Sequence, residues 1–208
     1  MDRRRRKADM GRHCAPLPSS DARRQPALHE LLARRLVILN IDDISKPKFV
    51  SGLDWSPPFP WPTHTALPVP FPLRGRQVML VADEDVVRLP GPTSPAFLWL
   101  VDITDETRPI PFASFQVAEE DGSPKQDYTG LHQFCEEIRS TEIPIAWFAH
   151  GLRVVDIANP HAPKEVASFM PDIPDGAKRV QSNDVCFDDR GLIYLIDRTR
   201  GLHILERL

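Results

Sequence analysis

The chain has 208 residues, of which 41% are hydrophobic and 26% are charged, and its formal net charge is −3. This length allows one domain with a sizeable core, or a domain that carries a tail. No run of eighteen apolar residues is present, and no apolar run follows the N-terminal arginines as it does in a secretory signal. These features predict a cytoplasmic protein without a membrane span.

The charge is divided unevenly along the chain. Residues 1–35 contain ten Arg or Lys and four Asp or Glu, a net charge of +6, so the other residues carry −9. We expect residues 1–30 to be a basic, disordered tail and residues 31–208 to form the folded domain. A basic run such as Arg3–Lys7 also suits nucleic acid, but a solvated terminus is the simpler interpretation, and a nucleic-acid partner is not expected.

A repeated phrase organises the predicted elements. In chain order its copies are LVILNIDDISKPKFVS at 36–51, LWLVDITDETRPIPFAS at 98–114, LRVVDIANPHAPKEVAS at 152–168 and the shorter LHILERL at 202–208. Each long copy begins with an apolar run that is too short for a helix and continues through an Asp or Asn suited to a turn. It resumes at a Pro, which fixes φ where the next strand starts. Each long copy therefore predicts a strand, a tight turn and a second strand.

Two further strands are predicted ahead of each of the last three copies. A stretch at 27–33 has apolar residues at helical spacing, yet it lies where a strand of the first unit would fall. The counts give two complete four-stranded units, three strands of another unit and only the last two strands of the first. The six additional strands are expected at 63–67, 77–82, 131–135, 143–148, 183–187 and 191–196.

Antiparallel four-stranded units at intervals of 50 to 62 residues predict an all-β fold of the β-propeller type. The strands lack the polar outer face that a β-sandwich requires. Only about three to four blades can be counted, whereas closed propellers have about four to eight. We therefore expect an incomplete array: a shortened relative, part of a longer gene, or a ring that closes by self-association. Uncovered blade faces favour a protein partner or a second copy.

The runs LVILN, LWLVD and LRVVD resemble the run for which the LVIVD-repeat β-propeller proteins of bacteria and archaea are named. The resemblance covers roughly residues 36–208. It implies a propeller and no particular activity, because most members of that family have none assigned.

Catalytic motifs are mostly absent from the sequence. We find no nucleophile elbow, no phosphate-binding loop, no dinucleotide-binding turn and no HExxH motif, and the three cysteines form no CxxC pair. The leading hypothesis is therefore a non-enzymatic binding or scaffolding propeller whose loops recognise another protein.

One group of residues supports a different hypothesis. The first strand of each blade lines the axis of a propeller, and the polar residues predicted there are His64, His132 and Asp184, with Cys135 and Cys186 nearby in the sequence. Imidazole, carboxylate and thiolate are ligands of transition metals. The alternative is thus a metal-dependent enzyme, an oxidoreductase or hydrolase, with a histidine-lined central channel. Such histidines are similar in arrangement to those of the selenium-binding or methanethiol oxidase family, which implies copper. Polar side chains that contact only water are the competing interpretation.

Overall fold

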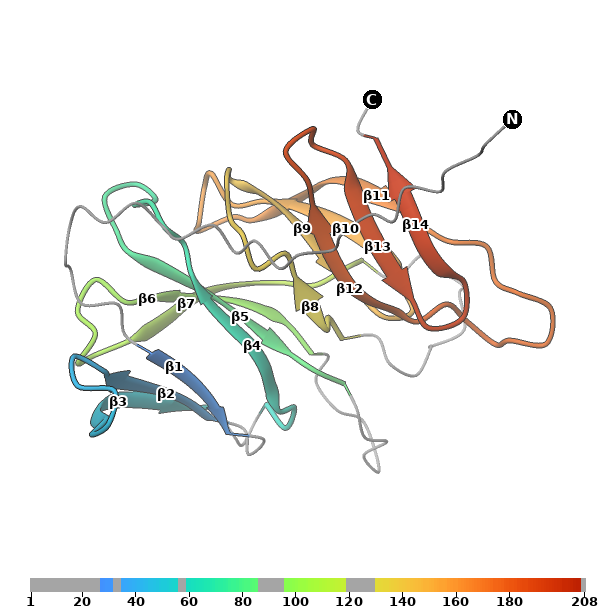
Figure 1. Ribbon diagram of the computed structural model, residues 1–208. Helices are drawn as coiled ribbons and strands as arrows, with labels where there is room; N and C mark the ends of the chain where they lie inside the picture. Colours follow the sequence, from blue (N-terminus) through green and yellow to red (C-terminus); the bar gives the residue numbers. More distant parts are fainter. Residues whose placement is uncertain (1–26, 32–34, 56–58, 86–95, 119–129, 207–208) are drawn as a thin grey trace, which may run out of the picture.

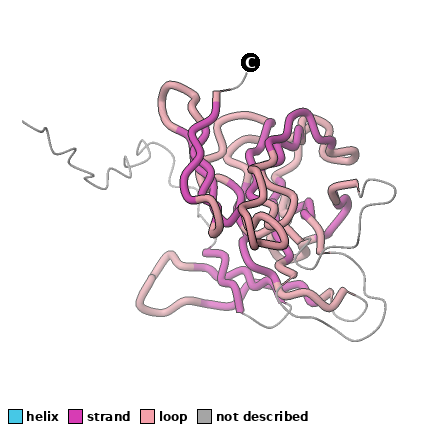
Figure 2. The backbone as a smooth tube through the Cα atoms, turned by 90° about the vertical axis from the view of Figure 1, so that its right-hand side faces the viewer, coloured by secondary structure: helices cyan, strands magenta, loops and turns pink. Residues whose placement is uncertain are grey.

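The described part of the computed structural model consists of strands and loops (Figures 1 and 2). It therefore contains no helix of the length and hydrophobicity needed to cross a membrane. The expected all-β fold is confirmed. The residues described are 27–31, 35–55, 59–85, 96–118 and 130–206.

The strands form four antiparallel sheets, two of four strands and two of three, and in each sheet neighbouring strands are consecutive in the sequence. We call these sheets blades I to IV in chain order. Blade I contains β1 (Ala27–Leu31), β2 (Arg35–Asn40) and β3 (Lys48–Asp54). Blade II contains β4 (Thr63–Pro68), β5 (Val78–Asp83), β6 (Leu98–Asp102) and β7 (Ile110–Phe115). Blade III contains β8 (Gln133–Phe134), β9 (Glu142–Ala146), β10 (Leu152–Asp156) and β11 (Lys164–Phe169). Blade IV contains β12 (Ser182–Phe187), β13 (Ile193–Asp197) and β14 (Gly201–Leu205).

Blade I has one strand more than the sequence predicts. The stretch at 27–33 contributes β1, which pairs antiparallel with β2 from Ala27 opposite Leu39 to Leu31 opposite Arg35. Pairing with a neighbouring strand has overridden the helical spacing of its apolar residues. The first strand also begins ahead of the expected domain boundary at residue 31, and residues 1–26 of the expected tail lie outside the described residues.

The turn inside each long phrase forms as its sequence predicts. The polar side chain that ends the apolar run accepts a hydrogen bond from the backbone N–H two residues later, at 3.0 Å for Asn40, 2.9 Å for Asp102 and 2.9 Å for Asp156. This bond closes the turn between the third and fourth strands of blades II and III, and between β2 and β3 of blade I. The repeated phrase therefore encodes the same hairpin three times.

The core consists of apolar layers between consecutive blades. Leu36 and Ile38 of blade I pack in one cluster with Met79 and Val81 of blade II. A second cluster joins blades II and III, and a third joins blades III and IV. Because blade II lies between two others, all six residues of β5 are buried, as expected for a continuous apolar strand covered on both faces.

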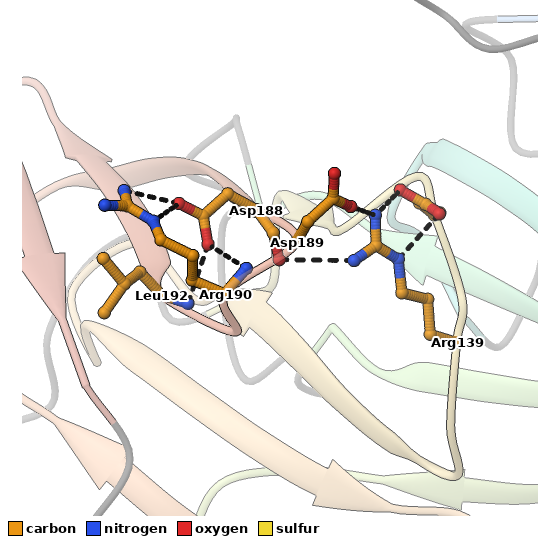
Figure 3. Close-up of polar contacts among 6 residues, drawn as sticks. Arg139, Asp188, Asp189, Arg190 and Leu192 are labelled. Atoms are coloured by element: carbon orange, nitrogen blue, oxygen red, sulfur yellow. Dashed lines mark hydrogen bonds and ion pairs between the residues drawn. The ribbon is translucent and has the colours of Figure 1, made fainter.

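Polar contacts also connect blades III and IV at one end (Figure 3). Arg139, in the loop between β8 and β9, donates two hydrogen bonds of 2.7 Å to the carboxylate of Glu137. It also donates to the backbone carbonyl of Asp188 and to the carboxylate of Asp189, both at 3.2 Å. The β8–β9 loop is thereby tied to the hairpin between β12 and β13.

Candidate metal centre

Three potential metal ligands meet where the inner strands of the blades approach one another. They are His64 on β4, Glu84 immediately after β5 and His132 immediately before β8. One ligand atom of each residue lies within 4.8 Å of the ligand atoms of the other two. Nε2 of His132 is 3.6 Å from Oε1 of Glu84, and the two imidazole ring centroids are 4.0 Å apart.

The strand register explains why the two histidines meet. In blades II, III and IV, one residue of the inner strand pairs with the equivalent residue of the second strand. The residue just before it in the chain is His64 in blade II, His132 in blade III and Asn183 in blade IV. They therefore share one position of the repeat, which we call the inner position. The pairs that establish it are Thr65 with Ala82, Gln133 with Ala146 and Asp184 with Ile196.

A second repeat position supplies the carboxylate. It lies two residues after the second-strand residue of each of these pairs, and we call it the rim position. The rim position holds Glu84 in blade II, Phe148 in blade III and Arg198 in blade IV. The backbone N–H of Glu84 donates to the carbonyl of Pro62 at 2.9 Å, and that of Arg198 donates to the carbonyl of Gln181 at 3.0 Å. The same bond therefore holds the rim residue beside the inner strand in blades II and IV.

Hydrogen bonds orient both imidazoles. Nδ1 of His132 lies 2.5 Å from the backbone carbonyl of Asn183, which can only accept, so Nδ1 carries the proton and Nε2 keeps its lone pair. Nδ1 of His64 lies 2.8 Å from the hydroxyl of Thr65, which gives its own proton to Oε1 of Gln133 at 2.6 Å. Thr65 therefore holds His64 at Nδ1, and a backbone hydrogen bond to His132 also holds its ring. Partners of this kind orient the ligands of metal sites.

Burial determines the protonation of the three residues. Burial lowers the pKa of His64. A backbone hydrogen bond to His132 and the charge of Asp184 act to raise this pKa, whereas the charge of Arg198 lowers it further. Burial also lowers the pKa of His132 to about 4, with the charge of His64 adding to the effect. The pKa of Glu84 is raised by burial against the attraction of Arg198. Both imidazoles are thus neutral at neutral pH, the form that coordinates a metal.

An aromatic side chain borders the three residues. The ring of Phe148, at the rim position of blade III, has its centroid 4.9 Å from that of His132. Its backbone has a φ of 26°, and it is one of two non-glycine residues with positive φ in the described chain. The backbone N–H of Ser182 donates to the carbonyl of Phe148 at 3.0 Å, which holds this strained conformation in place.

The donor set and its spacing fit a transition metal. At metal–ligand distances of about 2.0–2.1 Å, two ligand atoms of a tetrahedral site are about 3.3 Å apart. The 3.6 Å between Nε2 of His132 and Oε1 of Glu84 is close to that value, and the ligand atom of His64 lies within 4.8 Å of both. Two imidazoles and one carboxylate are a ligand set used for zinc and for non-haem iron.

The structure brings together only some of the site residues predicted from the sequence. His64 and His132 are brought together, whereas Asp184 is exposed and lies outside the three-residue group. Its carboxylate accepts a hydrogen bond of 2.8 Å from the backbone N–H of Val185. Cys135 is buried and Cys186 is exposed, and neither belongs to the group.

Sequence reasoning missed Glu84, because it follows a second strand, whereas the residues expected to line the axis come from first strands. The signal that could have identified it is the matching rim position, occupied by Phe148 and Arg198 in the next two blades.

Comparison of the chain with protein-family models gives no match, and no curated protein matches it either. The resemblance to LVIVD-repeat proteins therefore stays a prediction.

Proposed function

We propose that this protein binds one divalent transition-metal ion through His64, Glu84 and His132. The observation that supports this function best is the convergence of their three ligand atoms within 4.8 Å of one another. The hydrogen bonds to Nδ1 of both histidines add support, because such partners orient metal ligands, and the bond at His132 leaves its Nε2 as the ligand atom.

Three protein ligands meet within the described part of the chain, and a site with three favours a catalytic role over a structural one. Structural zinc sites are closed by four protein ligands, whereas catalytic sites keep a position open for water or substrate. A metal held here would act as a Lewis acid on a bound group or would lower the pKa of a bound water. We therefore favour the metal-dependent enzyme, an oxidoreductase or hydrolase, over the non-enzymatic scaffold that the missing motifs suggested.

Metal analysis of tag-free protein, purified without chelator, tests the proposal. We expect about one equivalent of zinc, iron or copper per chain. Glu84→Gln and His132→Ala should each lower the metal affinity by more than the roughly 10- to 100-fold that follows loss of a residue supporting a ligand, because each removes a ligand itself. His161→Ala is the matched control, because His161 is exposed and contacts the ring of Phe112 in another part of the molecule. Wild-type protein that binds no metal, or Glu84→Gln and His132→Ala proteins that bind it as tightly as wild type, would contradict the proposal.

An exposed apolar face on blade IV supports a second proposal, self-association. Ile196, Leu202 and Ile204 share this face and are 48%, 58% and 58% exposed. Three residues at the same repeat positions in blade II are fully buried against blade III. These are Ala82, Leu98 and Leu100.

Blade I of a second copy is the occupant that we propose for this face. Each of blades I, II and III has a face that is equivalent to the exposed apolar face of blade IV. In each case that face packs against the next blade, on the side of the next blade that carries the other set of side chains. The opposite face of blade I is also open, since Phe49, which pairs with Leu39, is 71% exposed. Two faces that the repeat normally joins are thus both uncovered by the described residues, and a second copy can cover them.

Sedimentation analysis checks this second proposal. We expect the wild-type chain to form a dimer or larger closed assembly, and Leu202→Glu to shift it to the monomer. Ile173→Glu serves as the control, because Ile173 is 53% exposed in a loop outside this face. A monomeric wild type, or equal dissociation in both variants, would refute the proposed contact.

A further inference from the structure

Arg198 lies at the end of a row of contacting rings that leads to the candidate metal centre. Its guanidinium carbon is 5.6 Å from the ring centroid of Phe148. The ring of Phe148 is 4.9 Å from that of His132, which in turn is 4.0 Å from that of His64. Because Phe148 is buried and held at positive φ, it provides a fixed support for the arginine beside the metal ligands.

The guanidinium of Arg198 makes no hydrogen bond or ion pair within the described part of the chain. Other arginines of blades III and IV do: Arg139 binds Glu137, Arg153 binds Glu165 and Arg190 binds Asp188. An arginine presents five N–H donors in a fork that matches the oxygens of a carboxylate or phosphate. The donors of Arg198 are therefore available to a ligand.

The charge of the site favours an anion. With a divalent metal bound, the ionised Glu84 and Arg198 leave a net charge of +2, and the exposed Asp184, whose charge acts on His64, reduces this to +1. The two imidazoles add no charge when they are neutral ligands. A ligand that brings one or two negative charges would neutralise a partly buried site, where an uncompensated charge is costly.

We infer that Arg198 recognises the oxyanion group, a carboxylate or a phosphate, of a small-molecule ligand that occupies the open positions of the metal centre. This inference rests on the metal binding proposed above and names the class of substrate. The guanidinium holds the oxyanion by paired N–H donors, and the metal contacts either the same group or the adjacent reactive group. Phe148 forms the apolar wall between the two anchors.

Cobalt-loaded full-length protein allows the metal and the anion to be followed separately. Cobalt bound by nitrogen and oxygen ligands absorbs visible light, and the spectrum changes when an added ligand alters its coordination. Acetate, inorganic phosphate and acetamide are titrated into wild type, Arg198→Ala and Arg200→Ala. Acetamide has the shape of acetate without its charge, and Arg200 is a matched control that lies two residues away and pairs with Asp172 at 3.8 Å.

We expect acetate or phosphate, but not acetamide, to change the spectrum of the wild type. The apparent dissociation constant should rise by about tenfold or more in Arg198→Ala, the loss typical of a charged hydrogen bond, and stay unchanged in Arg200→Ala. The stronger response identifies the ligand as a carboxylate or as a phosphate compound. Cobalt affinity and the thermal unfolding temperature should be the same in all three proteins.

The outcomes separate the two proposals. If the wild type binds no cobalt, the metal proposal itself is wrong. If cobalt binds but acetate and phosphate leave the spectrum unchanged, or act equally on Arg198→Ala, the metal proposal stands and the role of Arg198 is refuted. Loss of cobalt from Arg198→Ala would also refute it, because the arginine would then serve the assembly of the metal site.

Discussion

Two aspartates at the same repeat position, Asp83 in blade II and Asp197 in blade IV, behave in opposite ways. Each ends the second strand of its blade and pairs with the first residue of the inner strand, Thr63 and Ser182 respectively. Both are almost fully buried. Burial raises the pKa of Asp83 to about 7 despite hydrogen bonds from Trp99 and from the backbone. Burial also acts to raise the pKa of Asp197, but hydrogen bonds outweigh it and lower that pKa.

The number of donors explains the difference. Asp197 accepts bonds of 3.0 Å from the hydroxyl of Ser182, 2.8 Å from the N–H of Gln181 and 2.7 Å from both the N–H and the hydroxyl of Thr199. The side chain of Asp83 accepts a bond of 2.6 Å from Nε1 of Trp99, while its Oδ1 has no partner among the described residues. The tight turn after β13 offers N–H groups that the apolar layer between blades I and II does not. Aspartates at the same repeat position in two blades therefore have different pKa values, because their neighbours differ.

The largest expected effect is a difference in stability between truncating a leucine of blade II and truncating the equivalent leucine of blade IV. Leu98 is fully buried, whereas Leu202, at the same repeat position, is 58% exposed. Leu98→Ala should lower the free energy of unfolding by about 2–5 kcal/mol, because it leaves a cavity, and Leu202→Ala should change it by about 0.5 kcal/mol or less. Denaturant unfolding of dilute protein measures both. Similar losses in the two variants, at concentrations where the chain is monomeric, would contradict the exposure of Leu202 within one chain.

A smaller effect should appear in the pH dependence that Asp83 introduces. Because its pKa is raised, Asp83 keeps its proton in the folded state between about pH 4 and pH 7. In the unfolded state the same carboxyl group has lost that proton. Stability from this group is therefore complete below about pH 4 and is lost as the pH rises through about 7. Asp83→Asn, with chelator present, should remove this decline and be more stable than wild type at pH 8 by about 1–3 kcal/mol. Parallel stability curves for the two proteins would show that Asp83 ionises normally.

The smallest effect, of the opposite sign, is expected for Asp197. Its lowered pKa means that the stability it contributes is present above the unfolded pKa near 4 and is lost as the pH falls below that value. Asp197→Asn should lower the free energy of unfolding by about 1–2 kcal/mol at neutral pH, because an amide cannot accept all the bonds of the carboxylate. The difference from wild type should shrink on acidification to about pH 3. Urea unfolding at pH 7 and pH 3 measures it, and a deficit that grows in acid would contradict the assignment.

Much of the fold could be predicted from local patterns. The phrase copies at 36–51, 98–114 and 152–168 form hairpins in which a side chain of the phrase closes the turn, an interaction that depends on residues close in the sequence. All six additional strands, including the short β8, were predicted to within two residues of their ends. The strand β1 was not assigned, because its spacing also suits a helix and only its pairing with β2 decides the outcome.

The candidate site could be predicted only in part. His64 and His132 follow from the repeat, since both stand at the same place ahead of an inner strand. Asp184 was expected on the axis with them, but it stands one residue past the inner position, which Asn183 occupies. Along a strand a shift of one residue turns the side chain to the other face.

The sequence by itself determined the strands other than β1, the turns and the order of the blades, because these depend on apolar runs and on hydrogen bonds between residues two positions apart. Only the tertiary structure decided that Glu84 joins the two histidines, that Arg198 lies beside them, and that Asp83 and Asp197 differ in pKa. Each of these depends on how one blade packs against the next. Burial and long-range contacts follow from that packing, and a residue's own neighbours in the chain do not specify them.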